Sequence, residues 1–204
     1  MWTEHVVPRL VDLSLRGDQV GEYRVATCAG LHGRVLEIGF GSGLNTRCYP
    51  AEVASVSAVE PSDVGWRLSE RRRATSTAPV QRTGLDGQRL TEDDASFDTA
   101  LSTFTLCTIQ DAPRALAEVR RVLVPGGRLH FLEHGLGPDP AVRTWQRRLD
   151  PVQRRIAGGC HLTRDVPGLL EAAGFTVEGL EQDYLPGPGL ARPWTYVYSG
   201  RARC

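Results

Sequence analysis

The sequence predicts one α/β domain over residues 1–204, with a seven-stranded, mostly parallel sheet, an antiparallel last strand and helices on both faces. Short apolar runs rich in valine and leucine alternate along the chain with longer amphipathic segments, a pattern typical of repeated strand–helix–strand units. The length of 204 residues and the hydrophobic content of 41% are enough for one sizeable core. A glycine-rich turn after the first strand indicates where a ligand binds.

The first 30 residues should form two helices ahead of the sheet. Apolar side chains around Pro8 make residues 4–16 loosely amphipathic, and Gly17 would end that helix. Asp18 is a suitable N-cap for a second helix that ends near Gly30. These helices either cover a ligand or simply pack against the sheet.

A buried strand runs directly into the glycine-rich turn within residues 34–43. Its apolar run stops at three glycines on alternate positions, Gly39, Gly41 and Gly43. Glycine permits positive φ and lets the backbone approach a ligand, and the free N–H groups that follow can receive a nucleotide-like molecule. Glu37 lies inside the apolar run, where a carboxylate is costly without a polar partner, so we interpret it as a ligand-binding group.

The second strand ends in an acid. Residues 55–60 read as a strand that finishes at Glu60, 17 positions after Gly43 and directly before Pro61. In nucleotide-binding βαβ units an acid at this tip accepts hydrogen bonds from ribose hydroxyls. The two features together predict a nucleotide-type cofactor site.

Shorter elements connect these strands to the second half of the sheet. We expect a short helix at 44–49, a helix over 63–75 and a thin third strand at 79–82, followed by a polar loop. A helix over 111–123 then leads through a Pro-Gly-Gly turn at 125–127 into the fifth strand.

The fourth and fifth strands lead to the same edge of the sheet. Thr103, Phe104 and Leu106 follow at the carboxyl end of the fourth strand, where open α/β sheets bind ligands. The fifth strand, residues 128–134, would bring His134 to that edge.

The segment 135–164 is longer than a simple connection. Its apolar residues fall at near-helical spacing, and we expect a break and restart at Asp150 and Pro151. A long excursion at the ligand edge is typical of a substrate-binding lid, although a merely structural insertion is the alternative. His161 lies in this segment.

Composition argues against several classes of partner. Basic and acidic residues balance at 24 each, so no overall field draws the chain to nucleic acid. The five cysteines are odd in number and form no C-x-x-C pair, so we expect neither a disulfide framework nor a metal site. With no signal peptide and no run of 18 apolar residues, we expect no stable membrane anchor and a cytoplasmic location.

The glycine spacing distinguishes between nucleotide cofactors. A dinucleotide fingerprint reads G-x-G-x-x-G, whereas this turn reads G-x-G-x-G, with Leu44 in the place of the third glycine. A pyrophosphate is therefore disfavoured, and Glu37 would repel a phosphate but suit an amino group. S-adenosyl-L-methionine, which combines ribose, adenine and a cationic amino-acid tail, fits these features better than NAD.

Four motifs in order then identify a family. The chain resembles the class I S-adenosylmethionine-dependent methyltransferases over residues 25–185, through residues 35–43, 59–61, 97–98 and 123–129. Residues 131–134 and 158–165 resemble a narrower group, bacterial proteins similar to the animal membrane-associated thiol methyltransferases.

The resemblance implies a Rossmann-like methyltransferase domain and a set of site residues. In this family an acid-then-small pair at the start of the polar loop holds adenine, and Asp86 and Gly87 are the matching positions. The cofactor-binding residues that we expect are Glu37, Gly39, Phe40, Gly41, Gly43, Asn45, Glu60, Pro61, Asp86, Gly87, Thr103 and Leu106.

The domain then divides into four parts. We expect an N-terminal helical cover at 1–30, a cofactor-binding core at 31–134 and a substrate lid at 135–164. Residues 165–204 would supply the last helix and two terminal strands that pair antiparallel.

Methyl transfer to a small molecule needs alignment and exclusion of water more than it needs catalytic groups. A thiol acceptor with a pKa near ~8.5 is partly ionised at neutral pH, whereas an oxygen or nitrogen acceptor depends more on a general base. His134 and His161 are the candidate catalytic residues, although a lone histidine is more often structural. We expect S-methylation of a thiol. The alternatives are O- or N-methylation, a nicotinamide-dependent oxidoreductase and a non-catalytic cofactor-binding protein, and the oligomeric state stays open.

Overall fold

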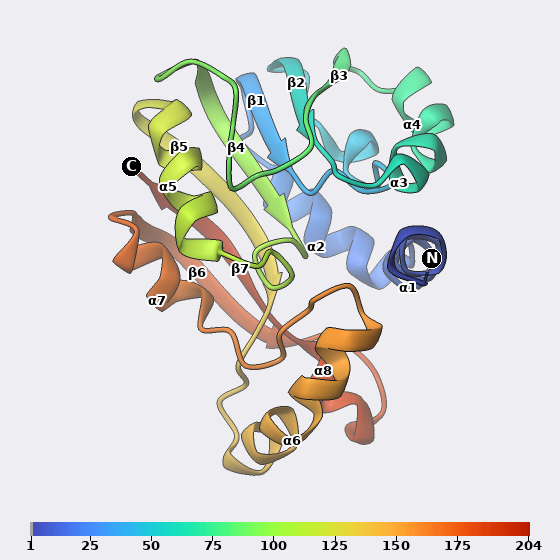
Figure 1. Ribbon diagram of the computed structural model, residues 1–204. Helices are drawn as coiled ribbons and strands as arrows, with labels where there is room; N and C mark the ends of the chain where they lie inside the picture. The colour runs from blue at the N-terminus through green and yellow to red at the C-terminus, as the bar shows by residue number, and fades with distance from the viewer. Residues whose placement is uncertain (1) are drawn as a thin grey trace.

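The computed structural model describes residues 2–204, which fold around one seven-stranded sheet (Figure 1). Met1, the first residue of the expected helical cover, lies outside the described residues. The strands are β1 (Gly33–Ile38), β2 (Val53–Val59), β3 (Val80–Gly84), β4 (Phe97–Thr103), β5 (Leu123–His134), β6 (Thr176–Tyr184) and β7 (Tyr196–Arg203). The helical segments are η1 (Trp2–Val6), α1 (Val7–Leu15), α2 (Asp18–Cys28), η2 (Thr46–Cys48), α3 (Asp63–Leu68), α4 (Glu70–Ala74), α5 (Ala112–Val122), α6 (Pro140–Ile156), α7 (Val166–Ala172), η3 (Gly189–Ala191) and α8 (Arg192–Thr195).

The sheet has the strand order β3-β2-β1-β4-β5-β7-β6. Strands β1 to β5 are parallel, and β7 runs antiparallel between β5 and β6. This confirms the seven-stranded sheet with an antiparallel last strand. The strand order reverses between β1 and β4, which is where open α/β sheets bind ligands beyond the carboxyl ends of their strands.

Helices cover both faces of the sheet (Figure 1). Helices α5 and α7 pack on one face, and α2 packs on the other, against β5 and β7. Adjacent residues of β1 show the two layers, because Leu36 belongs to the core cluster on the α5 side and Val35 to a second cluster with Cys28 of α2. Side chains alternate along a strand, so a short apolar run supplies both layers.

Helices α1 and α6 lie beyond the carboxyl edge of the parallel strands (Figure 1). The expected break at Asp150 and Pro151 is wrong, because α6 runs unbroken from Pro140 to Ile156. Pro151 lies on the exposed side of the helix. The buried Asp150 carboxylate accepts the Leu162 N–H at 2.7 Å and fixes the helix at this point.

The segment after the glycine turn differs from the expected helix at 44–49. It forms only the 3₁₀ turn η2 (Thr46–Cys48), because the side chains of Asn45 and Tyr49 turn inward to hydrogen-bond Glu37. The expected helix over 63–75 is divided at Ser69 into α3 and α4.

The fifth strand, expected at 128–134, begins earlier in the structure. Strand β5 begins at Leu123, and the Pro-Gly-Gly sequence forms an irregularity inside it, where the pairing moves from Phe97 with Leu123 to Thr99 with Arg128. The last strand begins at Tyr196, after the short helix α8.

Candidate active site

A cavity of about 650 Å³ opens at the carboxyl edge of the sheet. Its walls come from the glycine turn, the end of β2, the loops after β3 and β4, helix α1 and the residues just after α6. Five of the twelve residues expected to bind the cofactor line it, namely Gly39, Glu60, Pro61, Asp86 and Gly87. The volume is ordinary for a small-molecule site.

The three glycines of the turn have left-handed backbones, with φ of 67° at Gly39, 58° at Gly41 and 75° at Gly43. At Gly39 a Cβ would lie 1.9 Å from Oγ1 of Thr105, so glycine is required where the turn packs on the loop after β4. At Gly41 the nearest atom to a Cβ would be the Gly39 carbonyl oxygen, at 3.8 Å. Gly39 therefore has a packing role, and Gly41 leaves space for a side chain. Neither Gly41 nor Gly43 is on the described cavity wall, so their contacts with a cofactor stay predictions.

The carboxylate of Glu60 lies on the cavity wall at the tip of β2. The Gly41 N–H donates to Oε2 at 2.6 Å, and the Ser62 N–H donates to Oε1 at 2.7 Å. Burial raises the pKa of Glu60, while the two N–H groups and Arg82 act in the opposite direction. Each carboxylate oxygen keeps a further lone pair, so Glu60 can still accept hydrogen bonds from two neighbouring hydroxyls.

Asp86 and Gly87 form the part of the wall that follows β3. Oδ1 of Asp86 accepts both the side-chain and the backbone N–H of Gln88 at 2.9 Å, and these bonds lower the pKa of Asp86. A Cβ on Gly87 would lie 3.2 Å from Cδ1 of Ile109, so the backbone and the apolar Ile109 side chain approach closely here. A carboxylate beside an apolar wall suits a flat ring with an exocyclic amino group.

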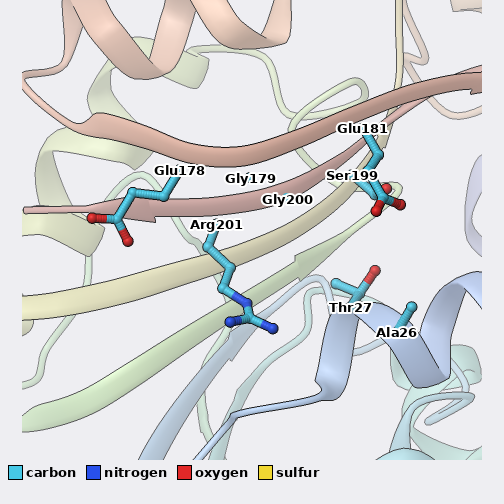
Figure 2. A pocket seen from close by; sticks show the side chains of 8 residues that line it. All are labelled: Ala26, Thr27, Glu178, Gly179, Glu181, Ser199, Gly200 and Arg201. Atoms are coloured by element: carbon cyan, nitrogen blue, oxygen red, sulfur yellow. The ribbon is translucent and has the colours of Figure 1, made fainter.

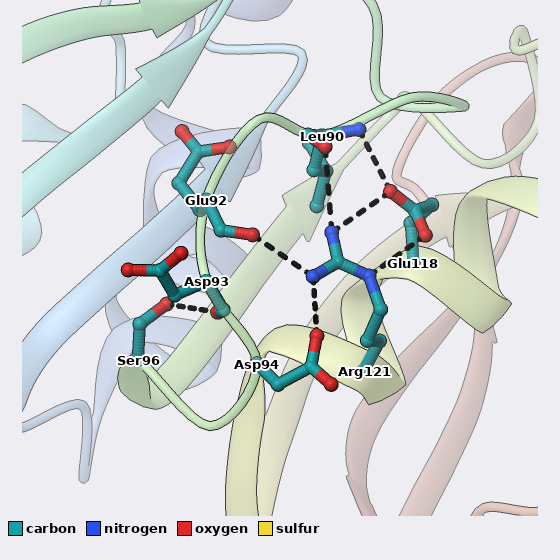
Figure 3. A network of polar contacts seen from close by, with 7 residues as sticks. All are labelled: Leu90, Glu92, Asp93, Asp94, Ser96, Glu118 and Arg121. Carbon is teal, nitrogen blue, oxygen red and sulfur yellow. Dashed lines mark hydrogen bonds and ion pairs between the residues drawn. The ribbon is translucent and has the colours of Figure 1, made fainter.

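The polar loop after β3 is anchored by Arg121 of α5 (Figure 3). The guanidinium donates to the carbonyls of Leu90 at 3.3 Å and Glu92 at 2.9 Å, and to the carboxylates of Asp94 at 2.7 Å and Glu118 at 2.9 Å. The Glu118 and Asp94 carboxylates raise the pKa of Arg121. One helical side chain therefore holds the loop that carries part of the cavity wall.

A buried polar network around Glu37 lies beneath the glycine turn. The fully buried Glu37 accepts hydrogen bonds from Asn45 Nδ2, at 2.9 Å, and from the Tyr49 hydroxyl. Nη1 of Arg24 donates to Asn45 Oδ1 at 2.7 Å and to Thr103 Oγ1 at 3.1 Å. Burial raises the pKa of Glu37 to about 7. The network supports the turn from behind, and direct contacts of Glu37, Asn45 and Thr103 with a cofactor stay predictions.

Phe40 and Leu106 are buried core residues in this structure. The Phe40 ring packs on Trp66 with 5.5 Å between the ring centroids, and Gly43 leaves room for it, since a Cβ there would lie 3.1 Å from the ring. The Leu106 carbonyl accepts a hydrogen bond from Arg164 at 2.6 Å. Neither side chain lies on the described cavity wall, so their expected cofactor contacts also stay predictions.

The structure brings the segments of His134 and His161 together, but neither histidine is on the described cavity wall. Nδ1 of the buried His134 lies 3.6 Å from Sγ of Cys160, and its Nε2 is buried without a hydrogen-bond partner among residues 2–204. His161 is half-buried, with Nδ1 3.9 Å from a carboxylate oxygen of Asp150. Burial is the main cause that lowers the pKa of His161.

Sequence reasoning missed most of the apolar cavity wall. Val7 of α1, together with Thr108 and Ile109 after β4 and Gly158 after α6, lines the cavity. Gly158 lies in the 158–165 motif, but Val7, Thr108 and Ile109 carry no motif, because they meet only in three dimensions. Phe104, expected near the cofactor, lines the cavity with a φ of 53°, a strained value for a non-glycine residue that often marks a functional position.

A second cavity, of about 330 Å³, lies between α2 and the strands β6 and β7 (Figure 2). Figure 2 shows Arg201 extending from β7 toward α2, with Glu178 and Glu181 of β6 nearby. Glu178 already pairs with Arg128 and Arg203. This cavity contains none of the predicted site residues and lies away from the ligand edge, so the larger cavity is the candidate active site.

Within residues 2–204, no cluster of three or more His, Cys, Asp or Glu side chains is arranged to hold a metal ion. No helix in the same part of the chain has the length and apolar character needed to cross a membrane.

The larger cavity fits an adenosine-type cofactor. Glu60 retains acceptor capacity for ribose hydroxyls, and Asp86 with Gly87 offers a carboxylate beside an apolar wall for adenine. The open space at Gly41 would allow the backbone of the turn to approach a ligand closely. These residues would hold S-adenosylmethionine.

Comparison with known proteins agrees with this geometry. Residues 36–131 match the family model described as "Methyltransferase domain". The thiol S-methyltransferase TMT1A of Homo sapiens is 32% identical over 180 residues, which cover 84% of this chain and 72% of the human protein. The thiol S-methyltransferase TMT1B of Rattus norvegicus is 35% identical over 153 residues, 72% of this chain, and the match spans only 62% of the rat protein.

A solved structure shares the fold. A methyltransferase from Thermotoga maritima, described as a possible histamine N-methyltransferase, aligns with a TM-score of 0.66 and 21% identity over 96% of this chain and 93% of its own. The strand order, the glycine turn with its acid partner and these similarities lead to one assignment. The chain belongs to the class I S-adenosylmethionine-dependent methyltransferases, and within them it is similar to the thiol S-methyltransferases.

Proposed function

We propose that this protein transfers the methyl group of S-adenosylmethionine to the sulfur of a small thiol. One observation carries the proposal: the titratable side chains on the described cavity wall are Glu60 and Asp86, both at positions expected to hold the cofactor. Neither candidate histidine is on that wall. An acceptor that ionises without a general base therefore suits the site best.

Thiols are such acceptors. A thiol with a pKa near ~8.5 is a few per cent thiolate at neutral pH and is an intrinsically strong nucleophile. When bound, S-adenosylmethionine supplies a methyl carbon attached to a positively charged sulfur. The protein then needs to hold the two reactants in line and exclude water, while the thiol proton passes to solvent.

The residues of this chain can both orient the cofactor and exclude water from the acceptor. Glu60 and the glycine turn would orient the cofactor, and the apolar side chains of Val7, Phe104 and Ile109 would shield the acceptor from water. Gly158 of the predicted lid also contributes to the wall. The relatives named as thiol S-methyltransferases support the same acceptor class.

Product analysis across a panel of small thiols, phenols and amines tests the proposal. We expect methylated product from at least one thiol at a kcat/KM well above that of any phenol or amine. Glu60→Ala is the control variant, because its impaired cofactor binding should lower the methylation of every acceptor. Preferential methylation of a phenol or an amine would replace the thiol by that acceptor, and cofactor binding by calorimetry without any product would favour a non-catalytic role.

A further inference from the structure

Two free thiols face each other where two walls of the cavity meet. Cys107 lies in the loop after β4, and Cys160 follows α6, 53 residues later in the chain. Their Sγ atoms are 3.9 Å apart. Thr108, next to Cys107, and Gly158, two residues before Cys160, both line the cavity.

The backbone holds this pair in place. The N–H of His161, directly after Cys160, donates to the carbonyl of Cys107 at 2.8 Å. A Cβ on Gly159 would lie 3.0 Å from the carbonyl oxygen of Thr108, so the two segments are in close contact on both sides of the thiols. A disulfide bond is about 2.05 Å long, so the sulfurs need to approach each other by roughly 2 Å for the bond to form.

The two thiols differ in their surroundings. Cys107 is fully buried, whereas Cys160 is partly exposed and has Nδ1 of His134 at 3.6 Å. The side-chain interactions of Cys160 with Cys107 and with His134 lower the pKa of the Cys160 thiol. A partly exposed thiol with a lowered pKa beside a buried thiol is the arrangement of an attacking cysteine and a resolving cysteine.

We propose that Cys107 and Cys160 form a redox-active dithiol, which a low-molecular-weight disulfide oxidises to a disulfide bond that joins the loop after β4 to the segment after α6. The Cys160 thiolate attacks one sulfur of the small disulfide, forms a mixed disulfide and releases one small thiol. Cys107 then attacks the Cys160 sulfur and releases the second small thiol. The protein loses two hydrogens, and the small disulfide is reduced to two thiols.

Peptide mass spectrometry of the full chain after incubation with oxidised glutathione tests the linkage. We expect a linked peptide pair that contains Cys107 and Cys160 and is two hydrogens lighter than the reduced pair, and dithiothreitol should reverse it. Cys107→Ser should trap glutathione on Cys160, and Cys160→Ser should abolish the linkage. Cys204→Ser, which removes a cysteine outside the pair, should leave it intact.

A second measurement asks whether the bond forms in the folded protein. Oxidation should raise the Tm of the wild type, because the bond constrains the unfolded chain, and it should leave the Tm of Cys160→Ser unchanged. The proposal is overturned if glutathione modifies only other cysteines, if Cys107 and Cys160 stay reduced, or if their linkage produces no reversible rise in Tm.

Discussion

Glu60 is positioned for its role by two backbone N–H groups, from Gly41 and Ser62. These bonds fix the direction of the carboxylate while leaving acceptor sites toward the cavity. Its environment is therefore preorganised before any ligand arrives, which lowers the cost of ordering on binding.

Glu60→Ala should weaken S-adenosylmethionine binding by roughly 2–4 kcal/mol, since charge-assisted hydrogen bonds to ribose are lost. Calorimetric titration measures this change in affinity. Asp63→Ala is the matched control, because Asp63 is an exposed carboxylate at the start of α3 that pairs with Arg82 and is not on the wall of the larger cavity. Equal affinities for wild type and Glu60→Ala would remove Glu60 from the cofactor site.

Glu37 should make stability depend on pH. Burial raises the pKa of Glu37 from 4.5 to about 7 in the folded protein, so the protonated carboxyl favours the folded state. This contribution to the free energy of unfolding is fully present below pH 4.5 and is lost as the pH rises through 7. The loss is about 3 kcal/mol, because each pKa unit corresponds to about 1.4 kcal/mol. Urea unfolding at pH 5 and pH 8 measures this loss in the wild type. Glu37→Gln is the control, because its side chain has no carboxyl group to titrate. A stability difference that does not change with pH would contradict the assignment.

A third prediction at the residue scale concerns the catalytic contribution of His134 and His161. If the acceptor is a thiol, His134→Ala and His161→Ala should each lower kcat/KM by ~10-fold or less, against the ~10²–10⁴ expected for a general base. Any such loss should shrink as the pH approaches the pKa of the thiol. The measurement is kcat/KM against pH with the best acceptor found. A loss above about a thousandfold at every accessible pH would indicate a general base and an oxygen acceptor.

At the scale of single elements, the buried face of α6 contains two polar residues, Gln146 and Asp150, beside the apolar Val142. Gln146 is buried, donates to the Gly135 carbonyl and accepts the Gly137 N–H, each at 2.9 Å. The apolar residues Trp145 and Val152, which predicted the helix by their spacing, are 53% and 56% exposed. Periodicity therefore predicted helical structure in this segment but not its continuity through Pro151, and specific hydrogen bonds decided which face packs.

The loop after β3 depends on one helical residue. Arg121→Gln should lower the free energy of unfolding by roughly 1–3 kcal/mol, because acceptors on the loop and on Glu118 lose a charged donor. It should also weaken cofactor binding, since Asp86 and Gly87 lie in the same loop. Urea unfolding and calorimetric titration measure the two effects.

Arg114→Gln in the same helix is the control for charge and helix propensity, because Arg114 is exposed. If both variants lose the same stability and affinity, Arg121 has no particular role in anchoring the loop.

At the scale of the whole molecule, one sheet carries both core clusters and the larger cavity. Cofactor binding should therefore stabilise the entire fold and not one part of it. At a free S-adenosylmethionine concentration of 100 times Kd, we expect about 2.7 kcal/mol of added stability and a single thermal transition. Calorimetry at matched concentration with Glu60→Ala should show a much smaller shift. Two separate transitions, with only one moved by the ligand, would contradict a single cooperative unit.

The order of residues along the sequence was enough to predict the sheet, the glycine turn and the acid at the end of β2. These features are local, because positive φ at Gly41 and an acid directly after strand β2 follow from residues close in sequence. Where local pattern and long-range contacts disagreed, the prediction was wrong. The helix expected at 44–49 gave way to hydrogen bonds between Glu37 and the side chains of Asn45 and Tyr49.

The cavity wall and the thiol pair depend on contacts between distant segments. Thr105 explains why Gly39 must be glycine, and Cys107 meets Cys160 only because the segment after α6 returns to the loop after β4. The same folding leaves His134 and His161 off the described wall, although the sequence placed both near the ligand edge. Side-chain direction at a strand end is set by packing across many residues, and no local pattern encodes it.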